Sequence, residues 1–402
     1  MNHEPITVAL VLMSVLPAIL VAAYARRRSL DRWLPSYARS CRARRARRTG
    51  EPVHVLLGVA DHYEPMLGDP LQGVADGRVE RWVNEYPRLF ARFRDSDGRP
   101  PRHSFFYPLE AYDPGHLDRL AQLCRAGFGE VEVHLHHDRE TANSLRARLL
   151  DYKQTLDRRH HLLARDRHTG AVKYGFIHGN WALDNSRPDG RWCGVSNELE
   201  VLRQTGCYAD FTLPSAPSPT QTRQINSIYY ARGQACRCKS HDRGTPAGLG
   251  HQPPESLMLI QGPLLLDWQR RKWGLLPRIE NACLQGNQAP SLDRLKLWLK
   301  ARVHVPQRPE WLFVKLHTHG APEWNQRVLL GEPMVRFHQV LARLAHEDRN
   351  FRYHYVTARE MYNLARAAEA DQPGDVADLL DYELTWNGAA TSRRAPNLLE
   401  TV

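Results

Sequence analysis

Residues 53–61 read VHVLLGVAD, an almost unbroken apolar run that closes at Asp61. Continuous apolar runs of this length are typical of strands that are buried on both faces, as in a parallel sheet. Comparable runs recur along the chain. They lie at 103–108, 129–141, 174–179, 208–214, 257–263, 311–320 and 351–357.

Between these runs the apolar residues are spaced three and four apart, which predicts amphipathic helices. The predicted helices are 78–94, 115–126, 141–164, 196–205, 291–302, 333–347 and 357–369. Alternation of strands and helices indicates the α/β class with a parallel sheet. Seven or eight such repeats favour a closed (β/α) barrel over an open, doubly wound sheet. No G-x-G-x-x-G turn follows the first strand, which disfavours a dinucleotide-binding domain.

The N-terminal segment has a different character. Residues 5–25 carry no charged side chain and would span roughly 31 Å as a helix, about the thickness of a membrane's hydrocarbon core. We therefore expect one transmembrane helix before the barrel. The predicted organisation is a transmembrane anchor at 1–25, an arginine-rich juxtamembrane segment at 26–50, the barrel domain at 51–370 and a C-terminal tail at 371–402.

Most of the net charge of +11 lies beside this apolar run. Ten arginines and Asp31 give residues 26–48 a net charge of +9, and residues 51–402 carry only +3. A nearly neutral domain gives no reason to expect a nucleic-acid partner. Arginine-rich flanks stay in the cytoplasm, so we expect an inner-membrane protein with its domain on the cytoplasmic side. The alternative is the periplasmic side.

Polar side chains stand where the predicted strands end, and in a parallel barrel these ends form one face. They are Asp61, His62 and Glu64 after the first strand, Tyr107 after the second, His136, His137 and Asp138 after the third, His178 after the fourth, and His317 and His319 after the seventh. Histidines at several strand ends indicate a site for a metal ion or for proton transfer.

The third strand reads GEVEVHLHHDRET at 129–141. Period-two alternation puts Glu132, His134 and His136 on one face of this strand. Imidazoles together with a carboxylate are a common ligand set for a divalent metal ion, with Zn²⁺ expected. His134 and His136 are the candidate ligands that this alternation indicates. Such an ion would serve amide or ester hydrolysis. A buried histidine without such a role would be a hydrogen-bonded core residue, and this remains the alternative for His134.

An aspartate after the first strand, a histidine cluster after the third and a late strand ending in KLH (315–317) resemble the polysaccharide deacetylase superfamily of carbohydrate esterases. In that family an Asp-Asp pair supplies a base and a metal ligand, H-x-x-x-H supplies two further ligands, and a late histidine is the general acid. The resemblance covers roughly residues 53–360 and implies a barrel of the deacetylase type.

Carried over by position, the resemblance makes Asp61 the catalytic base and His317 the catalytic acid. It places His62 where the family has its metal-binding aspartate, and His136 or His137 in the histidine pair. The H-x-x-x-H spacing is absent, because Glu140 or Thr141 stands at the second position. The substrate-binding candidates are Tyr107, His178, Trp181 and His319.

These observations together predict a membrane-anchored, metal-dependent hydrolase that removes acyl groups from a saccharide or a polysaccharide precursor. Expected partners are the saccharide, the membrane and proteins of envelope polysaccharide biosynthesis. A glycoside hydrolase is one alternative, although it needs two carboxylates beside the scissile bond. A non-catalytic saccharide-binding subunit is the other.

Overall fold

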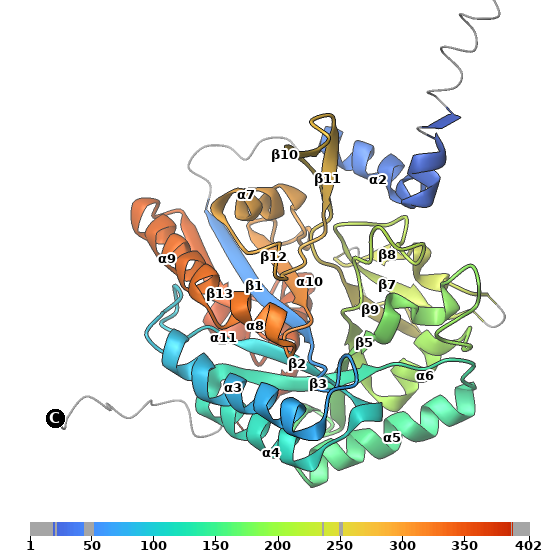
Figure 1. Ribbon diagram of the computed structural model, residues 1–402, viewed down its shortest axis with the longest axis vertical. Coiled ribbons are helices and arrows are strands. Elements are labelled where there is room, and N and C mark those ends of the chain that lie inside the picture. Colours follow the sequence, from blue (N-terminus) through green and yellow to red (C-terminus); the bar gives the residue numbers. More distant parts are fainter. Residues whose placement is uncertain are drawn as a thin grey trace, which may run out of the picture.

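The computed structural model describes residues 19–20, 22–43, 52–234, 237–248, 252–386 and 388. Strands and helices alternate through the domain, as predicted (Figure 1). Seven strands run parallel, each beside the next. In spatial order they are β12 (Trp311–Thr318), β1 (Val53–His62), β2 (His103–Pro108), β3 (Gly129–Leu135), β5 (Val172–His178), β6 (Cys207–Asp210) and β9 (Ser256–Ile260).

Further strands extend this sheet. β13 (Phe351–Tyr355) pairs in parallel with the first half of β1. The antiparallel strands β7 (Ile228–Arg232) and β8 (Thr245–Pro246) follow β9, while β4 (Ala164–Asp166) and β14 (Leu384–Thr385) extend from β5. Within the described residues the sheet has twelve strands of mixed direction. A separate hairpin pairs β10 (Leu265–Lys272) with β11 (Leu276–Glu280).

One face of the sheet is covered by helices that follow the strands, and their apolar side chains form an outer core with Val55, Leu57 and Val59 of β1. These helices are α3 (Gln72–Phe90), α4 (Pro114–Leu123), α5 (Ala142–Arg158), α6 (Glu198–Thr205), α7 (Leu292–Ala301) and α9 (Glu332–Glu347). The short α8 (Glu323–Leu329) precedes α9.

The opposite face packs on α10 (Ala358–Glu369) and α11 (Val376–Leu379). Side chains from β12, β5 and β7 share one buried inner core with α10, so the sheet curves around this helix. Met361 of α10 lies so close to Gly58 of β1 that a Cβ at that position would be only 2.9 Å from its Cε atom. The sheet of this domain therefore has helices on both faces.

This arrangement corrects the prediction of a closed barrel of the deacetylase type. The strand order begins at β12 and ends at β8, and no backbone pairing between these two ends is present in the described residues. Across the interior, Lys315 Nζ of β12 donates to Phe211 O and, at 2.5 Å, to Leu213 O, both in the segment that follows β6. Antiparallel strands at one end and α10 on the inner face replace the closure of a barrel.

The predicted membrane anchor is also corrected. Within the described residues no helix is both long and apolar enough to cross a membrane. This finding contradicts the single-pass topology and the inner-membrane localisation drawn from it. Most of the predicted span, 5–25, lies outside the described residues.

The arginine-rich segment contributes a helix to the domain. Its residues Leu30–Ala43 form α2, whose Trp33 is fully buried. Trp33 packs in one small cluster with Ala216, Ile225 and Leu264, which come from loops near the β10–β11 hairpin. The apolar face of α2 therefore packs against the domain itself. Residues 44–50 of the segment lie outside the described part of the chain.

Candidate metal centre

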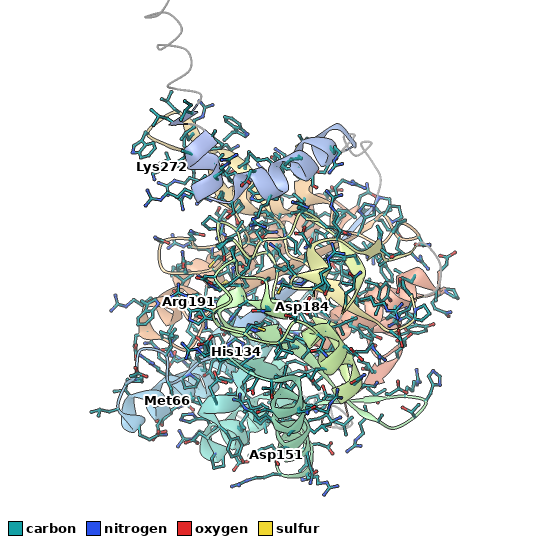
Figure 2. All side chains as sticks on the ribbon, turned by 90° about the vertical axis from the view of Figure 1, so that its right-hand side faces the viewer. Met66, His134, Asp151, Asp184, Arg191 and Lys272 are labelled. Atoms are coloured by element: carbon teal, nitrogen blue, oxygen red, sulfur yellow. The ribbon has the colours of Figure 1, made fainter. Side chains whose placement is uncertain are left out.

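Four imidazoles and one carboxylate meet at the carboxyl ends of β1, β3 and β12. His62 is the last residue of β1, and Glu64 follows in the next loop. His134 stands near the end of β3, and Figure 2 shows it within the body of the domain. His136 and His319 follow the ends of β3 and β12. We call these five residues the Glu64 cluster. Each of the four imidazole rings lies either next to Glu64 or next to another ring that contacts Glu64.

Glu64 is the centre of the cluster. Its Oε1 lies 2.8 Å from His134 Nε2 and 3.1 Å from His136 Nε2. Its Oε2 is buried, has no hydrogen-bond partner, and lies 3.9 Å from His319 Nε2. Glu64 and His134 supply one atom each to a set with His136 whose ligand atoms all lie within 4.8 Å of one another. Glu64 forms a second such set with His62 and His319.

In two of these histidines, the ring nitrogen that does not face Glu64 is hydrogen-bonded to another group of the protein. His134 Nδ1 donates to Ile177 O at 2.9 Å, which leaves Nε2 as the nitrogen available to a cation. His136 Nδ1 lies 2.5 Å from Glu110 Oε1, in the short helical turn Leu109–Ala111. Carboxylates and carbonyl oxygens in this position fix the orientation of metal-binding histidines in known sites.

The charges of the cluster are strongly coupled. Burial disfavours the ionised form of Glu64, but hydrogen bonds from His134 and His136 outweigh it and lower the Glu64 pKa well below its usual range. Burial also lowers the pKa of His136, yet Glu110 and Glu64 outweigh it and raise that pKa to about 10. Burial, followed by the neighbouring His319 and His134, lowers the pKa of His62. The surrounding carboxylates therefore attract positive charge to this point, either as protons or as a cation.

The cluster has an open side. His134 and Glu64 are buried, whereas the side chains of His136 and His319 are 32% and 26% exposed. The ring of His319 stacks on His62 at 4.7 Å between centroids. Trp181, from the loop after β5, lies 5.7 Å from His62 and 5.8 Å from His319. An aromatic side chain thus flanks the accessible part of the cluster.

The residues present fit a divalent metal ion. Imidazole nitrogens and a carboxylate oxygen are ordinary ligands for such ions, and a His₂Glu set is found in catalytic zinc sites. The buried Glu64 Oε2 lacks a hydrogen-bond partner, which is unfavourable for a carboxylate oxygen unless a proton or a cation compensates it. The predicted metal-binding character of this strand-end region is therefore supported, while the structure does not identify the ion.

Asp61, the predicted base, has other partners. Its Oδ1 accepts from Gly320 N at 2.6 Å, and its Oδ2 accepts from His103 Nε2 at 2.8 Å. Residues of β1 alternate between the two cores, so Asp61 faces the outer side together with Val59 while His62 faces the inner side. Asp61 therefore fixes the turn that carries His319 through Oδ1, while its Oδ2 is engaged by His103 of β2.

Within the described residues, neither His317 nor Tyr107 has a hydrogen bond or ion pair with Glu64. His317 is buried, and its Nδ1 has no hydrogen-bond partner. Burial, followed by the charge of Lys315, lowers the pKa of His317, which opposes a role as proton donor at neutral pH. The Tyr107 hydroxyl donates to Ala111 O at 3.1 Å and lies 3.0 Å from His116 Nδ1 of α4. Tyr107 belongs to the outer core.

Two other predicted residues, His137 and His178, lie beside each other at a ring-centroid distance of 4.6 Å but do not contact Glu64. Both contact Glu198. The four histidines that the sequence predicted as metal ligands therefore fall into two groups. His62, His134 and His136 gather around Glu64, whereas His137 belongs to a second group of side chains.

Sequence reasoning placed Glu64 at a strand end but assigned it no role, and it overlooked Glu110. Period-two alternation along 53–62 was the available signal, because it separates Asp61 from His62 and would have favoured Glu64 as the carboxylate. Nothing local in the sequence marks Glu110, whose contact with His136 joins residues 26 positions apart.

No protein-family model matches the chain, and a search of functionally characterised proteins found no significant similarity.

Proposed function

We propose that this protein is a metal-dependent hydrolase whose cation is held by Glu64, His134 and His136, with His62 and His319 beside it. The observation that carries the proposal is the buried, unpartnered Glu64 Oε2 in a cluster whose imidazoles present Nε2 atoms to the same carboxylate. Nitrogen and carboxylate donors without a thiolate suit Zn²⁺ or a similar divalent ion. Three protein ligands leave a position open, as catalytic sites require.

A bound divalent ion would supply Lewis acidity toward a substrate carbonyl and toward water. The protein's own groups would handle protons. Burial lowers the pKa of His319, so its ring is neutral near pH 7 and its Nε2 can accept a proton. His319 is also partly exposed, so a substrate can reach it. In this proposal His319 replaces His317 and Asp61 in proton transfer, and Asp61 positions the His319 turn.

For the substrate we propose an acylated saccharide. Trp181 offers an aromatic surface beside the two rings of His62 and His319, and rings of this kind commonly pack against the apolar faces of sugars. The resemblance to polysaccharide deacetylases supports the same substrate class. Hydrolysis of an amide or ester on the sugar then matches the Lewis-acid chemistry of the site.

The two alternatives are less well supported by the geometry. A glycoside hydrolase needs two carboxylates free to act on either side of a glycosidic bond. Both carboxylates at the cluster, Glu64 and Glu110, are engaged by imidazoles. A non-catalytic saccharide-binding subunit would use Trp181 but has no need of converging metal ligands.

The test combines metal analysis with hydrolysis of acetylated saccharides. We expect purified protein to release acetate in the presence of Zn²⁺. His134→Ala and Glu64→Ala should each weaken metal binding and abolish the release. His346→Ala is the matched control, because this histidine is exposed on α9. Full activity of His134→Ala would refute the proposal, and metal binding without any acetate release would favour the binding subunit.

A further inference from the structure

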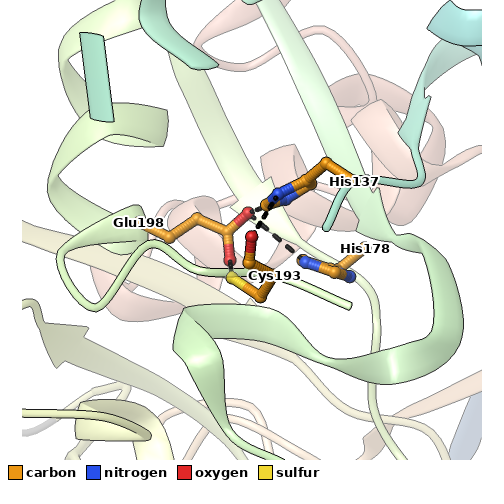
Figure 3. Close-up of side chains that lie close together, drawn as sticks. All are labelled: His137, His178, Cys193 and Glu198. Carbon is orange, nitrogen blue, oxygen red and sulfur yellow. Dashed lines mark hydrogen bonds and ion pairs between the residues drawn. The ribbon is translucent and has the colours of Figure 1, made fainter. Parts of the chain in front are cut away.

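Figure 3 shows a second group of side chains that could hold a metal ion. It consists of His137 after β3, His178 at the end of β5, Cys193 in the following loop and Glu198 in the first turn of α6. All four are buried, and their ligand atoms lie within 4.8 Å of one another. We call these residues the Cys193 cluster. The function proposed above makes no use of it.

The ligand atoms lie close to the spacing that a tetrahedral ion would require. Glu198 Oε1 lies 2.9 Å from His137 Nε2 and 3.6 Å from His178 Nε2. Cys193 Sγ lies 3.5 Å from Glu198 Oε2. Metal bonds of about 2.0–2.3 Å in tetrahedral geometry separate neighbouring ligands by roughly 3.3–3.8 Å, so only small shifts are needed.

Both histidines have their other nitrogen fixed by a backbone carbonyl. His137 Nδ1 donates to Cys193 O at 3.2 Å, and His178 Nδ1 donates to Gly179 O. A carbonyl oxygen only accepts, so each Nδ1 carries the proton, and each ring in its neutral form presents a lone pair at Nε2. His178 Nε2 is buried without a hydrogen-bond partner and faces the carboxylate of Glu198. Two acceptors turned toward each other in the interior are unfavourable unless a cation lies between them.

The Cys193 sulfur and the Glu198 carboxylate are also surrounded by hydrogen-bonding groups. Cys193 Sγ lies 3.3 Å from Asn185 N and 3.5 Å from Val195 N, and amide donors stabilise a thiolate. It also lies 3.6 Å from Val195 O. Asp184 N donates to Glu198 Oε2 at 2.6 Å, which orients the carboxylate. Supporting hydrogen bonds of this kind are characteristic of metal sites.

We propose that His137, His178, Cys193 and Glu198 bind a structural Zn²⁺ ion. Thiolate, imidazole and carboxylate are all zinc ligands, and the thiolate favours zinc over magnesium or calcium. The protein supplies all four ligands in a buried place, so no position remains for a substrate. Such a closed site contributes to folding and does not catalyse.

The ion would fasten the loop between β5 and α6 to the strand ends. In this loop Asn180, Trp181 and Asp184 have φ values of 55°, 55° and 54°, in the left-handed region that residues other than glycine seldom adopt. Such strain persists only where the surroundings impose it. By holding Cys193 and His178, the ion would keep Trp181 in place beside His62.

Cobalt substitution tests this site separately from hydrolysis. Co²⁺ bound by a thiolate gives a near-ultraviolet charge-transfer band, whereas the nitrogen and oxygen ligands of the Glu64 cluster give none. We expect the band in the full-length protein loaded with Co²⁺, and its loss in Cys193→Ser together with about one equivalent of metal. Cys124→Ala is the matched control, because Cys124 is buried in the outer core. Limited proteolysis should show faster cleavage within 179–197 in Cys193→Ser.

Absence of the band in the wild-type protein, or its survival in Cys193→Ser, would overturn the proposal. If Cys193→Ser does not fold, each of the other six cysteines is replaced singly. A band that survives all six replacements assigns the thiolate to Cys193, and loss of the band in any one of them assigns it elsewhere and refutes the site. These readouts need no substrate, so they remain decisive even if the proposed hydrolase activity fails.

Discussion

Among single residues, a side chain that hydrogen-bonds to a metal ligand determines how firmly that ligand is held in position. Glu110 contacts His136 at Nδ1 and at its backbone amide but lies outside the set of ligand atoms around Glu64. Glu110→Gln should therefore retain the metal site yet weaken metal affinity about 10–100-fold, the usual effect of losing such a partner. Competition with a chelator measures this change.

Glu347→Gln is the control for that experiment. Glu347 is exposed at the end of α9 and has no part in the contacts described for the Glu64 cluster. An affinity in Glu110→Gln equal to that of the control would mean that Glu110 does not orient a ligand.

A second prediction at this scale concerns acid stability. Burial lowers the pKa of His338 to about 3, and its Nδ1 lies 2.7 Å from the Tyr355 hydroxyl. The unfolded chain binds the proton near pH 6.5, whereas the folded chain does not, so His338 lowers the free energy of unfolding as pH falls from about 6.5 toward 3. The slope is at most about 1.4 kcal/mol per pH unit.

His338→Gln retains polarity without titrating in this range. Urea unfolding at pH 7 and pH 4.5 should show a smaller loss of stability in this variant than in the wild type, with the exposed His346→Gln as control. Equal losses in wild type and His338→Gln would exclude His338 as a source of the acid sensitivity.

At the scale of elements, α10 is held by buried charges as well as by apolar contacts. Arg359 Nε and Nη2 donate to the two oxygens of Glu130 at 2.9 Å and 2.8 Å. Thr357 and Glu360 form a capping box at the first turn of α10. Arg359→Ala should destabilise the protein by about 3–5 kcal/mol, because it removes the bidentate partner of the buried Glu130 carboxylate and leaves it with the long contact to Arg102. Thr357→Ala should cost about 1 kcal/mol.

Thermal or denaturant unfolding of the two variants tests this order. A smaller effect for Arg359→Ala than for Thr357→Ala would show that the existing contact with Arg102 Nη2, at 3.5 Å, is enough to compensate Glu130.

The docking of α2 gives a contrasting prediction. Trp33 is its main buried side chain, and its cluster with Ala216, Ile225 and Leu264 is separate from the two large cores. Trp33→Ala should therefore release α2 locally and leave the unfolding of the rest nearly unchanged. Limited proteolysis should show new cleavage within 30–43, and a fall in the global melting temperature comparable to that of Arg359→Ala would show that α2 is integral to the fold.

For the molecule as a whole, the spacing of apolar residues predicted the strands and helices but not whether the sheet closes into a barrel. All eight predicted strands are present, and β1 ends at His62, one residue beyond the prediction. The barrel was wrong because closure depends on pairing between the first and last strands, and no local spacing reports it. The short antiparallel β4, β7, β8 and β14 were missed for a related reason, since each has at most five residues and none forms a long apolar run.

The two candidate metal sites show the same division between local and distant information. His134 and His136 were predicted from alternation along one strand, and both contact Glu64. Cys193 and Glu198 were not predicted, because their contacts with His137 join residues 56 and 61 positions apart. Assigning both His136 and His137 to one metal site combined two groups that face different sides of the same strand end.

That strand end has a consequence for changes of chain length. His136 and His137 are consecutive, yet one contacts Glu64 and the other contacts Glu198. Deleting or inserting a single residue just before His136 would turn each ring toward the other's neighbours and disconnect both clusters at once. Relatives that retain both clusters should therefore show no gap between residues 131 and 137 in an alignment. Length differences should instead collect in exposed connections such as the tip of the β10–β11 hairpin.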